Sequence, residues 1–232
     1  MTRIAVLTAY VSEGATPEDH LYEIEHDTAD YYFFTDNEDH EVPDGWNKRL
    51  LYPCSIDKKF ENRRAGKAPK QLAHLLLPDY DYYIWHDYFH FVNEDPLKII
   101  ELMGDADMGL FRHPSGRSWI QELGAASHRE HSERVEATVA AFRDQLKIPL
   151  SSPLWELSCF IRKNNEKANK CFNLWNELTT LLSSRDQVSF IAAAHLEPPK
   201  IFTLPGTALA YGGNNDLITH KGSNLHSLPG VQ

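Results

Sequence analysis

Basic residues are concentrated in one short stretch of the chain. From Lys58 to Lys70 the sequence reads KKFENRRAGKAPK, with six basic residues and one acid. The net charge of the stretch is therefore +5, and since the whole chain carries −10, the rest sums to −15. One interpretation of such a basic run is a charged surface turn that is exposed to solvent. Pro69 suits the first turn of a helix, however, and a helix N-terminus adds free N–H groups and its dipole to the side-chain charges. We therefore predict an anion site here. We also expect Lys67 and Lys70 to be exposed, and since exposed charges contribute little to stability, replacing both with alanine should leave the fold intact.

A second set of polar residues follows an apolar run. The segment 82–85 (YYIW) leads into His86 and Asp87, and His90 comes three positions later. On one strand, residues four apart share a face, so His86 and His90 form a candidate metal pair. Chance proximity among 12 histidines is the other interpretation. Asp87 is either an ordinary turn aspartate or a ligand-binding group, and its place directly after the run favours the second role.

Two further motifs offer acid–base groups. In SRDQVSF, Asp186 is either the N-cap of the helix that follows or a group that contacts a ligand, and the two roles are compatible. His113 precedes Pro114 at the end of another apolar run, where a turn is the simpler interpretation. A positioned His or carboxylate serves as a general base, and Asp186, His113 and Glu122 are the candidates.

The elements that position these residues alternate between strands and helices. Strands are expected at 4–8, 31–34, 48–52, 82–85, 89–92, 108–111, 157–161 and 201–204, and helices at 69–77, 96–103, 119–146, 166–182 and 184–196. This alternation predicts an α/β fold with a mainly parallel central sheet flanked by helices. Ligands of such sheets bind beyond the carboxyl ends of the strands, where Tyr10, Asp36, Asp87 and His113 fall.

Length and composition indicate one globular unit. The chain has 232 residues, 42% hydrophobic and 24% charged, which excludes a mainly disordered or fibrous protein. We predict a domain over residues 1–205 and a tail over 206–232, rich in Gly, Asn and Ser, that folds over the site.

Charge and cysteine content restrict the setting and the partners. The net charge of −10 argues against broad binding to nucleic acid. Three cysteines without a CxxC pair argue against a disulfide framework or a cysteine zinc site and fit a reducing compartment. No stretch approaches the roughly 20 apolar residues of a membrane span, so we expect a cytoplasmic protein without one.

Several segments together resemble a known family. FFTDN, RRAGKAPKQLAHLLLPDYDYYIWHD, FRHP and SRDQVSF follow one another as in a glycosyltransferase-like family once classed as a domain of unknown function. That family includes plant Golgi proteins implicated in pectin and mucilage synthesis, together with microbial relatives. The likeness covers residues 4–195 and implies a nucleotide-sugar-dependent transferase of the GT-A type, a single α/β domain with a Rossmann-like N-terminal half.

The resemblance also implies a role for each candidate residue. By this resemblance, Tyr10 and Asp36 would contact the nucleoside, and Arg63, Lys67 and Lys70 would contact the diphosphate. Asp87 would bind a metal ion. Asp186 and Gln187 would line the sugar and the transfer site, and His113 would lie on the acceptor side.

The chain departs from the GT-A pattern at the metal motif. GT-A enzymes usually carry DxD, whose two carboxylates hold Mn²⁺ or Mg²⁺, whereas this chain has HDYFH with the single carboxylate of Asp87. His90 or the distant His220 would complete the ligand set, since Mn²⁺ accepts imidazole as well as oxygen. Alternatively the basic cluster replaces the metal.

The reaction implied is transfer of a sugar from a nucleotide donor, expected to be a UDP-sugar, to a hydroxyl of an acceptor. A glycan, a lipid-linked sugar, a protein or a modified nucleobase would serve as acceptor. No single base stands out, which favours a retaining enzyme over an inverting one. The alternatives are a non-catalytic nucleotide- or glycan-binding module with a degenerate metal motif, and a metal-dependent hydrolase that uses His86, Asp87 and His90.

Overall fold

The structure is a computed structural model that describes residues 2–11, 21–51, 58–127, 132–206 and 217–220. For residues 58–64, 126 and 218–220 it describes the backbone alone. Seven strands of the described chain form one sheet in the order β3-β2-β1-β4-β7-β6-β8. Their bounds are β1 (Ile4–Tyr10), β2 (Asp30–Thr35), β3 (Trp46–Leu50), β4 (Tyr82–His86), β6 (Met108–Arg112), β7 (Trp155–Lys163) and β8 (Ile201–Thr203).

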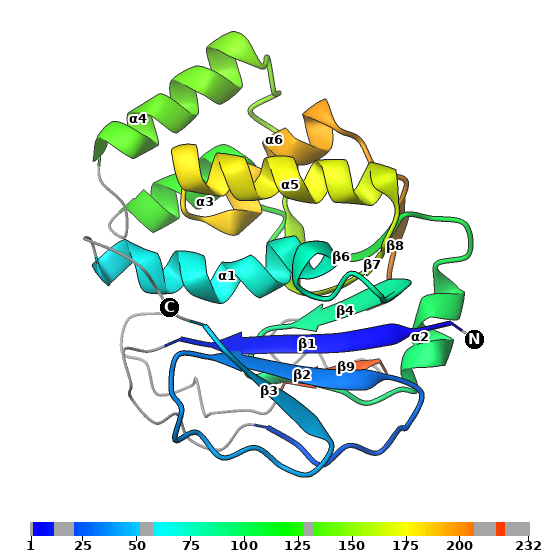
Figure 1. Cartoon of the computed structure of the whole chain (residues 1–232). Helices are drawn as coiled ribbons and strands as arrows, with labels where there is room; N and C mark the ends of the chain where they lie inside the picture. Colours follow the sequence, from blue (N-terminus) through cyan, green and yellow to red (C-terminus); the bar gives the residue numbers. More distant parts are fainter. Residues whose placement is uncertain (1, 12–20, 52–57, 128–131, 207–216, 221–232) are drawn as a thin grey trace.

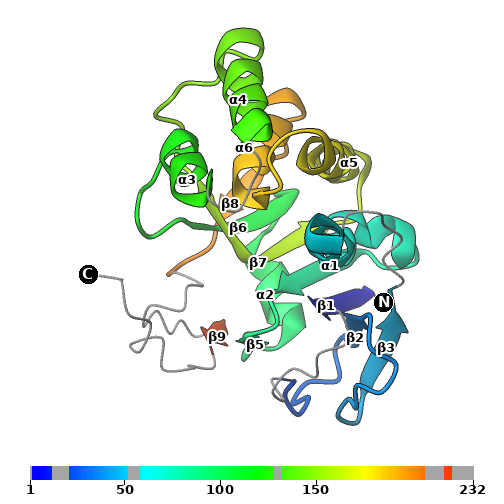
Figure 2. The ribbon, with the colours of Figure 1, turned by 90° about the vertical axis from the view of Figure 1, so that its left-hand side faces the viewer.

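Strand direction brings the ends of several strands to one edge of the sheet. The strand β7 is antiparallel to its neighbours β4 and β6, and every other neighbouring pair is parallel. The carboxyl ends of β1, β2, β4 and β6 therefore share an edge with the amino end of β7. In Figure 1 β1 points to the left, and Figure 2 views that edge. The predicted α/β class with a mainly parallel sheet is confirmed.

An irregularity interrupts the pairing of β6 with β7 close to this edge. Leu110 pairs with Phe160, but the next residue, Phe111, pairs with Glu156. Residues 157–159 are therefore extra on the β7 side and form a bulge. Bulges redirect side chains and are common beside active sites.

Helices cover both faces of the sheet and bury its apolar side chains. The helices α1 (Lys58–Leu76), α5 (Glu166–Leu181) and α6 (Asp186–Leu196) pack on one face, where α1 and α5 lie side by side in Figure 1. The helix α2 (Pro96–Leu102) packs on the other. A third cluster around Trp119 and Phe142 joins α3 (Trp119–Ala126) and a π-helical turn (Ala141–Gln145) to α6, and α4 (Ser132–Ala140) precedes that turn.

The start of α1 differs from the prediction. The helix begins at Lys58 and contains Pro69, with non-helical torsion angles at Leu72 (φ −113°, ψ 25°). The stretch KKFENRRAGKAPK is thus part of the helix and does not lead into its N-terminus, so the expected contribution of a helix N-terminus at Pro69 is wrong. The physical reason is that Lys, Arg, Glu and Ala favour helix strongly enough to continue through one proline.

Residues 217–220 return to the body of the protein. The strand β9 (Ile218–His220) pairs antiparallel with β5 (His90–Val92), and His90 is opposite His220. The backbone N–H of Asn93 donates to the carbonyl of Leu217 at 3.0 Å, and Leu217 is buried in the same apolar cluster as α2. The boundary predicted at 205/206 stays a prediction, and residues 207–216 and 221–232 lie outside the described chain. Among the helices that the structure describes, none has the length and apolar character to cross a membrane.

Candidate functional site

A pocket of about 610 Å³ opens at the edge where these strand ends meet. Seven residues predicted from the sequence line it together: Lys70, Asp87, His90, His113, Glu122, Asp186 and Gln187. They come from α1, β4 and its following turn, β5, the end of β6, α3, and the start of α6. The shared edge of the sheet therefore collects residues that are up to 117 positions apart in the chain (70 to 187).

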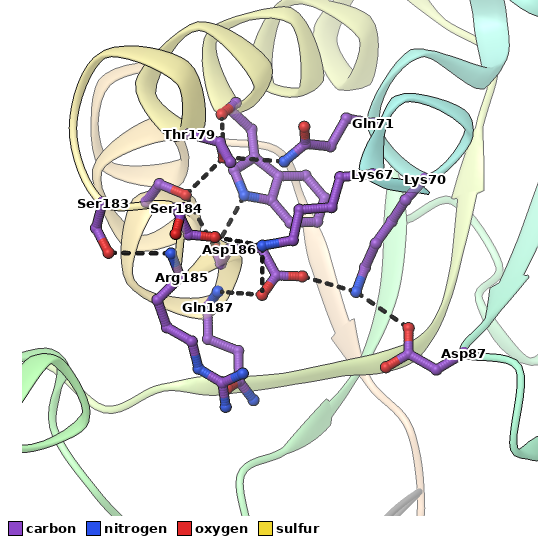
Figure 3. Close-up of polar contacts among 12 residues, drawn as sticks. Lys67, Lys70, Gln71, Asp87, Thr179, Ser183, Ser184, Arg185, Asp186 and Gln187 are labelled. Carbon is purple, nitrogen blue, oxygen red and sulfur yellow. Dashed lines mark hydrogen bonds and ion pairs between the residues drawn. The ribbon is translucent and has the colours of Figure 1, made fainter. Parts of the chain in front are cut away.

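Two lysines and two aspartates form a connected group, which we call the lysine–aspartate cluster: Lys67, Lys70, Asp87 and Asp186 (Figure 3). Lys70 Nζ donates to Asp186 Oδ2 at 2.8 Å and to Asp87 Oδ1 at 3.3 Å. Lys67 Nζ lies 3.6 Å from Asp186 Oδ1 and donates to the carbonyl of Ser184. The side chain of Lys70 is only 5% exposed, which contradicts the expectation that both lysines are surface groups.

The charges of this cluster cancel, and the pKa values reflect their proximity. Burial alone would raise the pKa of Asp186, but Lys67, Lys70 and Arg185 offset it and hold the pKa well below its usual range. Burial would likewise lower the pKa of Lys70, but Asp186 and Asp87 raise it above its ordinary value. The lowered pKa of Asp186 and the raised pKa of Lys70 therefore keep this pair ionised over the physiological range of pH.

Asp186 is not the N-cap of α6. Arg185 occupies that position without a side-chain cap, and Asp186 is the first helical residue. Its Oδ1 accepts from the N–H of Gln187 at 3.2 Å, and its carbonyl accepts from Trp175 Nε1 at 2.9 Å. The capping interpretation is therefore wrong, because the carboxylate is turned toward the lysines (Figure 3).

The pocket lining also carries two arginines that the sequence analysis did not assign to a site. Arg185 Nε donates to Glu122 Oε1 at 2.7 Å, and Arg117 Nη1 donates to Glu122 Oε2 at 3.3 Å. Both oxygens of Glu122, a candidate base from the sequence, are thus engaged. Beside them His113 Nδ1 lies 2.9 Å from Ser115 Oγ, and burial lowers the pKa of His113 below its ordinary value of 6.5.

Glu156 and Ser158 of β7 also line the pocket, and the sequence analysis missed them. Glu156 Oε1 accepts from the N–H of Ser158 at 2.9 Å, and the carbonyl of Ser158 accepts from the N–H of Asp87 at 2.6 Å. The prediction considered only carboxyl ends of strands, whereas β7 runs the other way and presents its amino end here. The polar residues of WELS, at the start of an otherwise apolar strand, were the available signal.

Other predicted residues lie outside the pocket lining. The ring of Tyr10, at the end of β1, contacts the ring of Tyr88, with centroids 4.9 Å apart. Asp36 follows β2 at the same edge of the sheet. Arg63 belongs to α1 and His220 to β9, but their side chains are among those not described.

The described residues do not fit a divalent metal ion well. No group of three or more His, Cys, Asp or Glu side chains in the described part of the chain is arranged to hold one. The carboxylates of Asp87 and Asp186 already share the ammonium of Lys70. His86 and His90 belong to the different strands β4 and β5, so they do not share the face of one strand, and this favours chance proximity over the alternative of a metal pair. Burial lowers the pKa of His86 to about 4, and its Nε2 lies 3.4 Å from the hydroxyl of Tyr22.

Comparison with known structures supports the fold. The chain is similar to a structure titled as the apo form of WbbM, a bifunctional glycosyltransferase. The TM-score is 0.51 and the identity 8%, over 88% of this chain and 39% of that one. At this identity the likeness concerns the fold alone.

Comparison of sequences identifies the family. The probable hexosyltransferase MUCI70 of Arabidopsis thaliana is 24% identical over 185 residues, which are 71% of this chain and 32% of the relative. This chain thus matches about a third of the relative's length. The model of the TOD1/MUCI70 glycosyltransferase-like domain matches residues 56–204. That segment contains α1, the bulged strand β7 and all of the pocket-lining residues. The chain therefore belongs to the TOD1/MUCI70 glycosyltransferase-like domain family.

Proposed function

We propose that this domain transfers a sugar from a nucleotide-sugar donor to a hydroxyl group of an acceptor. The observation that carries the proposal is the lysine–aspartate cluster, in which Lys70, Asp87 and Asp186 line the pocket at the strand-end edge and Lys67 contacts Asp186 beside it, in a chain of a glycosyltransferase-like family. Lysine ammonium groups stabilise the charge that grows on a departing diphosphate, and such electrostatic stabilisation is usually the largest catalytic contribution.

The two lysines would have different tasks. Lys70 is held between two carboxylates, so its charge is largely used in positioning Asp87 and Asp186. Lys67 is more exposed than Lys70, with 19% of its side chain accessible against 5%, so a phosphate oxygen can reach its ammonium more easily. We assign the first diphosphate contact to Lys67, with Arg63 beside it on α1, and the nucleoside to Tyr10 and Asp36 at the neighbouring strand ends.

Proton transfer and stereochemistry follow from the same pocket. The oxygens of Glu122 are engaged by two arginines, which makes Glu122 a poor base. His113, whose pKa is lowered by burial, is neutral at pH 7 and can accept a proton on the acceptor side. Retention, in which the departing phosphate takes the proton, stays our prediction, and an inverting reaction would rely on His113 or Asp186.

Metal dependence stays a separate prediction. Among the described residues Asp87 is the oxygen ligand proposed for Mn²⁺ or Mg²⁺, with His90 and His220 to complete the set. Because the described donor groups fit an ion poorly, no step of the reaction is assigned to one here.

A donor screen tests the proposed function. Thermal-shift measurements with UDP-, GDP-, CDP- and ADP-sugars, with Mn²⁺ and with EDTA, should show stabilisation by one nucleotide class. Lys67→Ala should weaken binding of that donor by about tenfold or more, the size of a lost charge-assisted contact. Lys170→Ala is the matched control, because Lys170 is an exposed lysine paired with Glu166 at the start of α5 and does not line the pocket.

The outcomes also separate the alternatives. Donor binding without transfer to any offered glycan, lipid-linked sugar, protein or nucleobase would favour a non-catalytic binding module. Release of phosphate from simple esters only in the presence of metal would favour a hydrolase. Failure of every nucleotide sugar to stabilise the protein would contradict the proposed function.

A further inference from the structure

Three side chains that line the pocket each hold a hydrogen-bonding atom that has no partner in the part of the chain that the structure describes. Among the described residues, none bonds to Glu156 Oε2, Ser158 Oγ or Gln187 Oε1, although all three atoms are buried. The residues are 2%, 8% and 6% exposed, and each lines the pocket. We call this group the acceptor-rich wall.

The wall is held in place by the backbone. Glu156 directly precedes the bulge of β7 and Ser158 lies within it, and the N–H of Ser158 donates to Glu156 Oε1, so that Oε2 is the oxygen left over. The carbonyl of Ser158 accepts from the N–H of Asp87, and the N–H of Gln187 donates to Asp186. Both contacts tie the acceptor-rich wall to the lysine–aspartate cluster, so a single ligand in the pocket meets both.

Buried polar atoms without partners are unusual and costly. Most buried polar groups in proteins are hydrogen-bonded, and each exception destabilises the folded state. Glu122, in the same pocket, has both carboxylate oxygens paired with arginines. Three unpaired atoms together on one wall of a pocket therefore indicate that a ligand completes their hydrogen bonds.

The chemistry of the wall selects the ligand. A carboxylate oxygen and an amide carbonyl only accept, and a serine hydroxyl both donates and accepts. A phosphate group, which carries negative charge and acceptor oxygens, does not complement them. Neighbouring hydroxyl groups of a sugar do, since each offers an O–H donor.

We propose that Glu156, Ser158 and Gln187 form the subsite that binds the hydroxyl groups of a hexose. The proposal rests on the proposed function for the identity of the sugar as substrate. The hexose is either the transferred sugar of the donor or a sugar unit of the acceptor, and the binding experiment below distinguishes these sources.

Stability measurements test the first part of the proposal. Removing an unpaired hydroxyl leaves no partner unsatisfied, so Ser158→Ala should keep or raise the melting temperature. The matched control is Ser189→Ala. Ser189 is also buried, but its hydroxyl lies 2.8 Å from Thr179 Oγ1 and 3.2 Å from the Asp186 carbonyl, so its loss should lower the melting temperature. An equal loss in both variants would mean that Ser158 has a structural partner and would overturn the proposal.

Binding measurements test the second part with UDP, UDP-glucose, UDP-galactose and methyl hexosides as probes. If the subsite takes the donor sugar, Glu156→Gln should remove the extra affinity of a UDP-hexose over UDP, a loss of about tenfold or more. If it takes the acceptor sugar, Glu156→Gln should instead remove the saturation-transfer NMR signal of a methyl hexoside bound beside UDP. UDP affinity itself should be unchanged in both cases.

The controls keep this proposal separate from the proposed function. A protein that binds no nucleotide contradicts the proposed function, while methyl hexosides without nucleotide still report on the subsite. The subsite proposal is overturned if the wild type shows neither a hexose-dependent gain over UDP nor binding of any methyl hexoside. It is equally overturned if Glu156→Gln leaves both kinds of binding unaltered.

Discussion

The lysine–aspartate cluster and the acceptor-rich wall differ in whether their polar groups have protein partners. In the lysine–aspartate cluster each ammonium faces a carboxylate, and Lys70 bridges two of them. On the acceptor-rich wall, three buried atoms have no partner among the described residues. The first wall is complete without a ligand and is held rigidly by its own charges. The second is complete only when hydroxyl groups supply the missing donors.

The difference shows how one pocket can handle two chemically unlike parts of a substrate. Buried charges are costly to desolvate, but in this cluster each is offset by an opposite charge, and Lys67 is the member proposed to contact a phosphate. Unpaired acceptors lower stability and are tolerated where binding energy repays the loss. Four substitutions test this difference between the lysine–aspartate cluster and the acceptor-rich wall, and they are given from the largest expected effect to the smallest.

Lys70→Met should have the largest effect. Removing the ammonium leaves Asp186 as a buried carboxylate without its shortest ion pair, although Lys67 and Arg185 still act on it, so we expect a loss of about 3–5 kcal/mol in the free energy of unfolding. Urea denaturation measures it. The double variant Lys70→Met with Asp186→Asn should recover much of the loss, because the buried charge is then gone.

The pH dependence of the Lys70–Asp186 contribution follows from the two pKa shifts. Folding lowers the pKa of Asp186 below 3.8 and raises that of Lys70 above 10.5, so the pair contributes fully between these values. The contribution declines as the pH falls below the first value or rises above the second. An unchanged urea midpoint in Lys70→Met at pH 7 would contradict the strong pairing of this wall.

Asp186→Ser should separate stability from catalysis. Serine stabilises a helix only when it occupies the N-cap, and Asp186 does not occupy it. The Asp186→Ser variant should therefore be no more stable than Asp186→Ala. Both variants should lose about 100-fold or more in transfer activity, as expected for a lost base or key polar contact. Retained activity in the serine variant would remove Asp186 from the transfer site.

Titration of His113 should make the transfer activity of the protein fall at acid pH. Burial lowers the pKa of His113, so the ring is neutral at pH 7 and becomes protonated only as the pH falls through this lowered value. The charged groups that act on it are Glu156, Glu122, Arg117 and Arg185. Activity should fall about tenfold per pH unit below that pKa if the neutral ring is required. His113→Gln should abolish this fall in activity, and an identical profile in the variant would assign the fall to another group.

Lys67→Ala should have the smallest effect on stability, about 1 kcal/mol or less, since Lys70 still neutralises Asp186. The contrast with Lys70→Met is the sharpest test of the different tasks given to the two lysines. If chemical denaturation gives equal losses for the two variants, the assignment of Lys70 to positioning and Lys67 to the diphosphate is wrong.

The alternation of strands and helices allowed the sequence to predict the fold class. Parallel strands separated by helices bring their carboxyl ends to one edge, and this rule correctly grouped Asp87 with His113. The stretch around Lys67 and Lys70 was also correctly brought to the site, although through side-chain pairs with Asp186 and not through a helix N-terminus.

Strand direction explains what sequence reasoning missed. The pattern of apolar residues gives no sign of which way a strand runs, so the sequence predicts a strand over 157–161 without a direction and gives no reason to look for site residues at its start. The antiparallel β7 and its bulge bring Glu156 and Ser158 into the pocket. Contacts between residues far apart in the sequence decide which carboxylate oxygens are hydrogen-bonded. Both oxygens of Glu122 accept from arginines, whereas Glu156 Oε2 has no partner among the described residues, and no local sequence pattern predicts this difference.

The return of residues 217–220 to pair with β5 matters for how the protein can be shortened. Ending the chain at 205, where composition places the domain boundary, would remove the partner strand of β5 and uncover the apolar cluster that Leu217 closes. His90, which lines the pocket from β5, would lose the strand opposite it. A truncated protein would therefore be prone to aggregation and proteolysis even though every residue matched by the family model were present, so expression should extend at least to residue 220.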